Sequence, residues 1–331
     1  MPNLFRIFAA VKKIVSFIIL CIMFGAACQR ATVQQFDGVA FGTTFHIAYI
    51  GNNSRTLPQQ VDSVLQHISS TFSIFDTNSL ISRVNSAQDP ALDEDFQRVL
   101  QTALHISAKT DGAFDCTVQP LVELWGFGRE GHKQVVPPSA IDSVKEFVGS
   151  ERIHLQDGKL VKDDPRVQLN FNAIAKGYAV DKVAEFLVSK GHANCLVEIG
   201  GEVVARGSKG KRPWKVGIQT PTVTADGPVE SQRSFELRDH AVATSGNYRN
   251  FFEKDGKRYT HILNPVTGRP EETNLLSVTV IASDCATADA YATAFMVLGL
   301  EKSMRIVKGD ENLEACFIYD EGGKLKVEST F

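Results

Sequence analysis

The 331-residue chain has little net charge, no long apolar run beyond its start and no repeated segment. Its 35 Lys and Arg nearly balance its 38 Asp and Glu, for a formal charge of −3. This balance excludes the strongly basic surface typical of proteins that bind nucleic acid. After residue 30 there is no apolar run of about 18 residues, so no transmembrane helix is predicted there. The composition, 43% hydrophobic and 22% charged, is that of an ordinary globular protein.

Several common catalytic and binding motifs are also missing. The sequence has no Walker loop, no GxGxxG after a strand and no GxSxG elbow, so P-loop, Rossmann and serine hydrolase sites are not predicted. It has no CxxC pair and no Cys/His cluster with zinc spacing. Four widely spaced cysteines in apolar contexts are instead predicted to be buried core residues: Cys116, Cys195, Cys285 and Cys316.

The first 28 residues have the layout of an export signal. Arg6, Lys12 and Lys13 precede the apolar stretch 14–24, and small residues at 25–27 lead into Cys28. A Cys directly after small residues resembles the signal of a bacterial lipoprotein, in which that Cys carries the lipid. A plain signal peptide or an uncleaved anchor remains the alternative.

By this resemblance, residues 1–27 form a lipoprotein signal peptide, Cys28 is the lipid attachment site and residues 28–36 are a polar tether. The mature chain would then be lipid-anchored at the periplasmic face of a bacterial membrane. Residues 37–331 contain no linker of distinct composition, so they are predicted to form one compact domain.

Hydrophobic spacing predicts helices interspersed with short strands in this domain. Because they do not alternate as strict βαβ units, the expected class is α+β, with mixed or antiparallel sheets flanked by helices. Helices are predicted from Pro58, around 96–112, over 173–190 and over 285–298, with Ser283 or Asp284 as the cap of the last. Strands are predicted at 41–50, 195–199, 214–219, 241–244 and 276–282, with a terminal hairpin at 315–328.

Three segments carry side chains suited to chemistry. Asp289 and Thr293 are four residues apart and share one face of an apolar helix, where their oxygens suit Mg²⁺ bound to a phosphate. Lys176 is predicted in the first turn of a helix after a loop of small residues, a typical anion site. His261 precedes an Asn-Pro turn, where catalytic groups are common. Each also has a purely structural interpretation, such as a solvent-facing Asp or a core His.

Eight sequence blocks are recognisable as a set. Their order resembles the ApbE family, the FAD:protein FMN transferases, which are often exported bacterial lipoproteins, and the resemblance runs from about residue 38 to 299. The blocks are Phe41–Phe45, Thr110–Asp115, Trp125–Gly128, Ala173–Asp181, Glu198–Glu202, Ala243–Tyr248, His261–Gly268 and Ala288–Thr293.

The resemblance implies an Mg²⁺-dependent enzyme that transfers FMN from FAD to a Thr or Ser hydroxyl of an exported redox protein, releasing AMP. Its implied metal ligands are Asp289, Thr293 and the carbonyl of Ala173, and His261 is the implied catalytic residue beside the flavin. The positions implied to line the FAD are Ala113, Phe114, Asp115, Asn170, Lys176, Ile262 and Ile74.

The sequence departs from the family pattern at three places. Asn170 and Glu202 stand where Asp is usual, and Ile74 or Phe75 must replace a Tyr that commonly lies against the flavin. Neither of the first two changes removes an implied metal ligand. Two alternatives to the transferase remain: an Mg²⁺-dependent FAD pyrophosphatase that yields FMN and AMP, and a non-catalytic flavin-binding lipoprotein.

Overall fold

The computed structural model describes residues 32–86, 88–129, 131, 134–219, 231–247, 251–254 and 257–331. The predicted signal peptide and Cys28 lie outside these residues. Residues Val33–Phe331 cluster as one unit by their contacts. Among the described residues, no helix combines the length and apolar character needed to cross a membrane.

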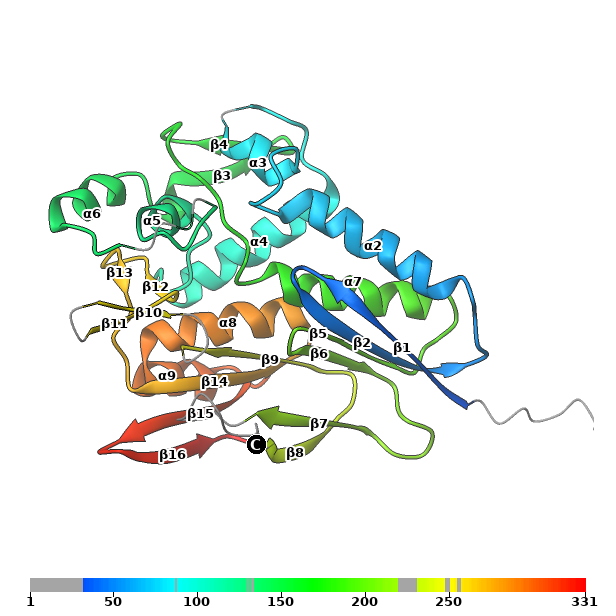
Figure 1. The fold of residues 1–331 in the computed structure, drawn as a ribbon. Coiled ribbons are helices and arrows are strands. Elements are labelled where there is room, and N and C mark those ends of the chain that lie inside the picture. The colour runs from blue at the N-terminus through cyan, green and yellow to red at the C-terminus, as the bar shows by residue number, and fades with distance from the viewer. Residues whose placement is uncertain are drawn as a thin grey trace, which may run out of the picture. The chain divides into compact units, whose positions relative to one another are not determined.

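An eight-stranded sheet forms the centre of the fold (Figure 1). The pairings described from β2 onward are antiparallel, which agrees with the predicted α+β class. In spatial order the strands are β1 (Thr32–Ala40), β2 (Thr43–Gly51), β5 (Cys195–Ile199), β6 (Glu202–Arg206), β9 (Ala241–Gly246), β14 (Leu275–Ala282), β15 (Glu314–Glu321) and β16 (Lys324–Ser329).

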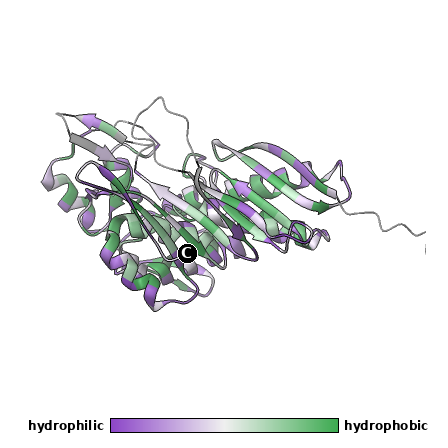
Figure 2. Ribbon diagram, turned by 90° about the horizontal axis from the view of Figure 1, so that it is seen from below, coloured by the Kyte–Doolittle hydropathy of each residue, from purple (hydrophilic) through white to green (hydrophobic). Residues whose placement is uncertain are grey.

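The alternation of side chains along each strand gives the sheet two apolar faces. In β2, Phe45 and Ile47 belong to the main core, whereas Ala48 belongs to a smaller cluster on the opposite face. Figure 2 shows apolar residues recurring along the strands, with hydrophilic residues at outer turns. The smaller cluster is covered by Trp214 and Leu237 from the separate hairpin of β7 (Trp214–Gln219) and β8 (Ser231–Leu237).

Helices cover the other face in two layers. The inner layer, α7 (Ala175–Ser189) and α8 (Cys285–Leu298), packs on the strands, and α2 (Leu57–Phe72) and α4 (Glu94–Lys109) pack on the inner helices. Side-chain caps fix two helix starts: Asp93 accepts the Phe96 N–H at 2.7 Å, and Asp284 accepts the Thr287 N–H at 2.8 Å. Two more helices adjoin this layer, α3 (Leu80–Asn85) and α9 (Leu300–Gly309).

A satellite cluster around Trp125 lies beside the main core. The Trp125 indole N–H donates to the Gly268 carbonyl at 2.9 Å, which joins segments distant in the sequence. The surrounding elements are α5 (Gln119–Leu124), α6 (Pro138–Lys145), β10 (Phe251–Lys254), β11 (Lys257–Thr260), β12 (Leu263–Asn264) and β13 (Arg269–Pro270). A 3₁₀ turn (Ser150–Arg152) leads into a further hairpin, β3 (Ile153–Gln156) and β4 (Lys159–Lys162).

Most predicted elements of the domain are confirmed, with β5, β7 and α8 at the predicted bounds. β1 begins at Thr32 and therefore includes the second half of the segment 28–36 that was predicted to be a tether. The exposed residues of β1 alternate with partly buried ones at the edge of the sheet. Because the segment is mostly polar, its hydropathy alone predicts a linker and not an edge strand. The four cysteines of the domain are buried and form no disulfide among the described residues, as predicted.

The two inner helices approach unusually closely where Gly177 of α7 meets the start of α8. A Cβ placed on Gly177 would lie 2.2 Å from the Cys285 carbonyl oxygen, a backbone atom that cannot rotate away. The Gly177 N–H also donates to the Asp289 carboxylate at 3.1 Å. Only glycine therefore fits this helix crossing without displacing α8.

Gly177→Ala is expected to destabilise the protein by about 2 kcal/mol or more, because overpacking in a rigid core forces backbone shifts. Gly309→Ala is the matched control, since nothing lies within 4 Å of a Cβ at that helical glycine. Urea unfolding followed by circular dichroism measures both. Equal stability of the two variants would contradict the packing argument.

Candidate functional site

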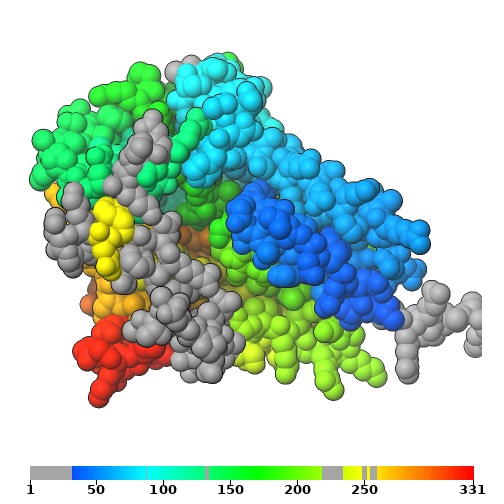
Figure 3. Space-filling view, viewed as in Figure 1, coloured from blue at the N-terminus to red at the C-terminus, as the bar shows by residue number. Residues whose placement is uncertain are grey.

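A cavity of about 1150 Å³ opens between the sheet, the inner helices and the satellite cluster. Figure 3 shows the hollow beside the β1–β2 hairpin, with later segments of the chain visible inside it. Its volume lies just above the range of about 300–1,000 Å³ that is usual for small-molecule sites. The predicted site residues that line it are Ala113, Phe114, Asp115, Asn170, Ala173, Lys176, His261, Ile262, Asp289 and Thr293.

Oxygen donors suited to a hard cation come together at the α8 side of the cavity. Asp289 and Thr293 lie one turn apart on α8, and Ala173 lines the cavity just before α7. Oxygen ligands of this kind are those that Mg²⁺ prefers. The described residues contain no group of three His, Cys, Asp or Glu side chains arranged to hold a metal, so a cation here would also need hydroxyl or carbonyl ligands.

Lys176 and Glu202 form a short ion pair beside Asp289. The Lys176 Nζ lies 2.6 Å from the Glu202 Oε1. Glu202 is only 2% exposed, and its Oε2 is buried without a hydrogen-bond partner among the described residues. An unsatisfied buried carboxylate oxygen at a cavity wall is costly unless a ligand completes it.

The pKa values of these three groups reflect the crowding of charge. Burial, together with the charge of Asp289, raises the pKa of Glu202 to about 7. Burial also raises the pKa of Asp289, although Lys176 and the Gly177 N–H oppose it. Burial alone would lower the pKa of Lys176, but the charges of Asp289 and Glu202 raise it. Two carboxylates thus share one ammonium group, which favours binding of a further cation.

Two of the polar side chains predicted to line the FAD form hydrogen bonds with other groups of the protein. Asp115 accepts hydrogen bonds from Thr117 and from the Ser150 N–H, and its burial raises its pKa. The Asn170 amide donates to Gln119 at 2.7 Å and its oxygen accepts the Asn172 N–H at 2.8 Å. Both residues shape the cavity wall through these contacts.

The aromatic side of the cavity corrects one prediction. Ile74 is buried in the main core and does not line the cavity, whereas the adjacent Phe75 lines it and is 62% exposed. Both residues lie in the turn that follows α2, where the Ile74 side chain is buried in the core and Phe75 is exposed. Of the two candidates at this position, Phe75 is therefore the one that lines the cavity.

Sequence reasoning missed a polar group on β1, β2 and β5 in the cavity wall. His46 of β2 pairs across the sheet with Glu198 of β5, and its Nδ1 lies 2.7 Å from the Asp37 carboxylate. All three line the cavity. Because roughly 150 positions separate β2 from β5 in the sequence, no local pattern could reveal this pairing.

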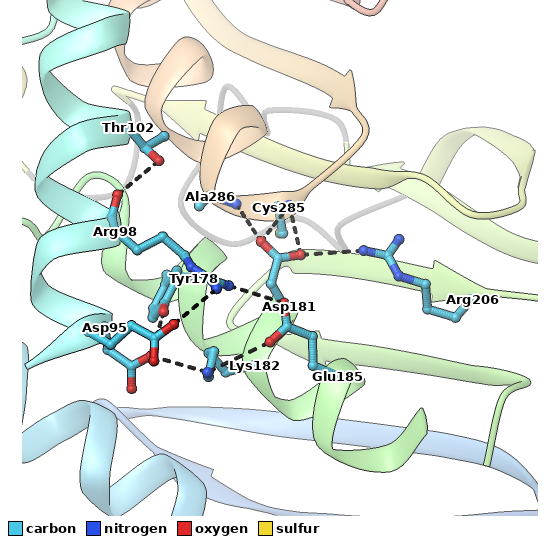
Figure 4. A network of polar contacts seen from close by, with 11 residues as sticks. Asp95, Arg98, Thr102, Tyr178, Asp181, Lys182, Glu185, Arg206, Cys285 and Ala286 are labelled. Carbon is cyan, nitrogen blue, oxygen red and sulfur yellow. Dashed lines mark hydrogen bonds and ion pairs between the residues drawn. The ribbon is translucent and has the colours of Figure 1, made fainter. Parts of the chain in front are cut away.

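A buried carboxylate also holds the start of α8 in place (Figure 4). Asp181 of α7 accepts the backbone N–H groups of Cys285 and Ala286 at 2.8–2.9 Å, and Arg206 lies 3.9 Å away. Burial raises the pKa of Asp181 to about 7. On the outer side of α7, Asp95 accepts hydrogen bonds from Tyr178 and pairs with Lys182, which ties α4 to α7.

Comparison with protein families gives one match that spans most of the chain. The sequence model of the ApbE family matches residues 41–317. A protein of Vibrio cholerae named FAD:protein FMN transferase is 37% identical over 317 residues, which cover 92% of this chain and 94% of that protein. A protein of Escherichia coli K12 with the same name is 36% identical, covering 91% of this chain and 88% of its own length.

Solved structures agree with the sequence comparison. The flavin transferase ApbE from Vibrio cholerae superposes with a TM-score of 0.81 at 35% identity, covering 90% of this chain and 97% of that one. The apo form of the Pseudomonas stutzeri flavinyl transferase ApbE gives a TM-score of 0.82 at 34% identity, covering 90% and 95%.

Proposed function

Since the chain belongs to the ApbE family, we propose that it is an FMN transferase that uses FAD and an acceptor protein. The acceptor hydroxyl oxygen, from a Thr or Ser of an exported redox protein, attacks the phosphorus of the FMN half. The bond from that phosphorus to the AMP oxygen breaks, AMP leaves with the electron pair, and the hydroxyl proton passes to a base. The product is a phosphoester between FMN and the acceptor.

The convergence of charged and oxygen-bearing side chains on one large cavity carries this proposal. Lys176, Asp289 and Thr293 line the same cavity as His261. The FAD diphosphate would lie near Lys176, Asp289 and Thr293, and the acceptor hydroxyl would approach His261. Such positioning of reactants contributes much of the rate in phosphoryl transfer.

Mg²⁺ fits the donor set of this site. Asp289 supplies a carboxylate, Thr293 a hydroxyl and Ala173 a carbonyl, and the two buried carboxylates exceed the one ammonium that faces them. When bound, the ion would neutralise charge on the phosphates. Lys176 adds a fixed positive charge, held by Glu202, to the same region.

His261 is proposed to accept the proton of the acceptor hydroxyl. It lies at the end of β11, just before the β12–β13 hairpin, with its neighbour Ile262 buried in the core. This anchoring holds the imidazole at the cavity wall without making it part of the core. A neutral imidazole at such a position is a suitable general base.

Asp289→Asn is expected to lower the rate of flavin transfer at least a hundredfold, because it removes the charged ligand proposed for Mg²⁺. Asp284→Asn on the same helix is the matched control, since Asn caps a helix as well as Asp. Each protein is incubated with FAD, Mg²⁺ and a redox domain bearing a Thr or Ser attachment site, and flavin on the acceptor is read by in-gel fluorescence.

For the wild-type protein, fluorescence on the acceptor supports the transferase. Free FMN and AMP without labelled acceptor would instead show a pyrophosphatase, and bound FAD without turnover would show a flavin carrier. Full transfer by Asp289→Asn would remove this residue from the metal site.

His261→Asn is expected to lower the transfer rate by about 10²–10⁴, the usual effect of losing a general base. FAD affinity, measured by flavin fluorescence quenching, should change little. His240→Asn serves as the control, because His240 is exposed and is not among the residues lining the cavity. A near-normal rate combined with weaker FAD binding would make His261 a flavin contact and place the base elsewhere.

We further propose that the mature protein is anchored by lipid at Cys28 on the periplasmic face of the membrane. The support is the order of basic residues, apolar stretch and small residues before that Cys. In Cys28→Ala, the protein should appear unprocessed or leave the membrane fraction on cell fractionation. A processed Cys28→Ala protein that stays with the membranes would contradict lipidation there.

A further inference from the structure

Three exposed apolar residues either line the cavity or lie next to residues that line it. Phe75 lines the cavity itself, Phe41 lies two residues before the lining residue Thr43, and Val266 follows the lining residue Pro265. Their exposures are 62%, 37% and 59%. We call Phe41, Phe75 and Val266 the apolar rim. Exposed apolar residues beside a site are typical of a surface that another molecule covers.

The position of Phe41 is the most unusual of the three. It occupies the first central position of the two-residue turn between β1 and β2, with φ of 52°, and Gly42 follows with φ of 73°. A turn with both φ values positive favours Asn-Gly, because Asn and Gly adopt the left-handed conformation most easily. An aromatic residue in this conformation has a strained backbone. Because Phe41 is 37% exposed, packing within the chain compensates this strain only in part.

Backbone strain of this kind is more often kept at functional positions than elsewhere. Nothing lies within 4 Å of a Cβ placed on Gly42, so the tip of the hairpin is open to an approaching molecule. Directly after the turn, the start of β2 is held in place, since Thr43 packs against the Gly200 turn that also lines the cavity. The hairpin thus holds an exposed apolar residue at a defined place, next to Thr43 and Thr44 in the cavity wall.

We propose that the apolar rim is the docking surface for the flavin acceptor protein. This inference rests on the proposed function and adds the surface by which the second substrate is recognised. A hydroxyl on a folded protein can reach a phosphorus atom inside the cavity only if that protein covers the mouth. Phe41 and Val266 would then be buried against apolar residues beside the acceptor's Thr or Ser.

The turn geometry provides a variant that tests Phe41 without harming the fold. Phe41→Asn removes the aromatic ring and introduces the residue that the turn prefers, so thermal stability should not fall. Leu325→Asn is the matched control, because Leu325 is 38% exposed and lies on β16 at the opposite edge of the sheet. Initial transfer rates are measured against acceptor concentration at saturating FAD and Mg²⁺.

For Phe41→Asn, the KM for the acceptor is expected to rise about tenfold with kcat little changed, since truncating an aromatic contact at an interface has an effect of this size. The KM for FAD should stay near the wild-type value, and the melting temperature should stay at or above it. Leu325→Asn should behave as wild type. Val266→Asn should raise the acceptor KM in the same direction.

An unchanged acceptor KM in both rim variants would overturn the docking surface while leaving the transferase intact. A raised KM for FAD with a normal acceptor KM would overturn it as well, because the rim would then contact flavin. The proposed function fails separately, when the wild-type protein labels no acceptor at any concentration.

Discussion

The crossing of α7 and α8 at Gly177 is the contact on which the site depends. Lys176 precedes this glycine on one helix and Asp289 follows the crossing on the other, so the distance between the helices sets the distance between their charges. Asp181 fixes the crossing a second time by accepting the first backbone N–H groups of α8. A core contact and a buried cap therefore define the geometry of groups at the cavity wall.

The same crossing explains why the site retains unfavourable electrostatics. Glu202 and Asp289 are both removed from water, and one lysine cannot compensate both, so their pKa values rise. Replacing Lys176, Glu202 and Asp289 by apolar residues of similar volume would stabilise the protein without ligand. The arrangement becomes favourable only when a ligand supplies the missing positive charge beside the two carboxylates and its anionic group pairs with the Lys176 ammonium.

Local features of the fold could be read from the sequence, whereas pairings between distant segments could not. The apolar helix 285–298 and its Asp284 cap follow from spacing and side-chain chemistry alone. The pairing of His46 with Glu198 depends on the order of strands, which no local pattern encodes. Ile74 shows a third limit: a one-residue uncertainty in an irregular segment exchanges the core side chain with the one facing the cavity.

The burial of the four cysteines in the described part of the chain has a chemical consequence. Desolvation raises the pKa of Cys195 to about 11 and those of Cys116 and Cys285 well above their usual value. With so little thiolate and no solvent access, these sulfurs are poor nucleophiles for disulfide exchange. The described domain is thereby insensitive to the redox potential of its surroundings, and it needs no reducing partner to keep these thiols apart.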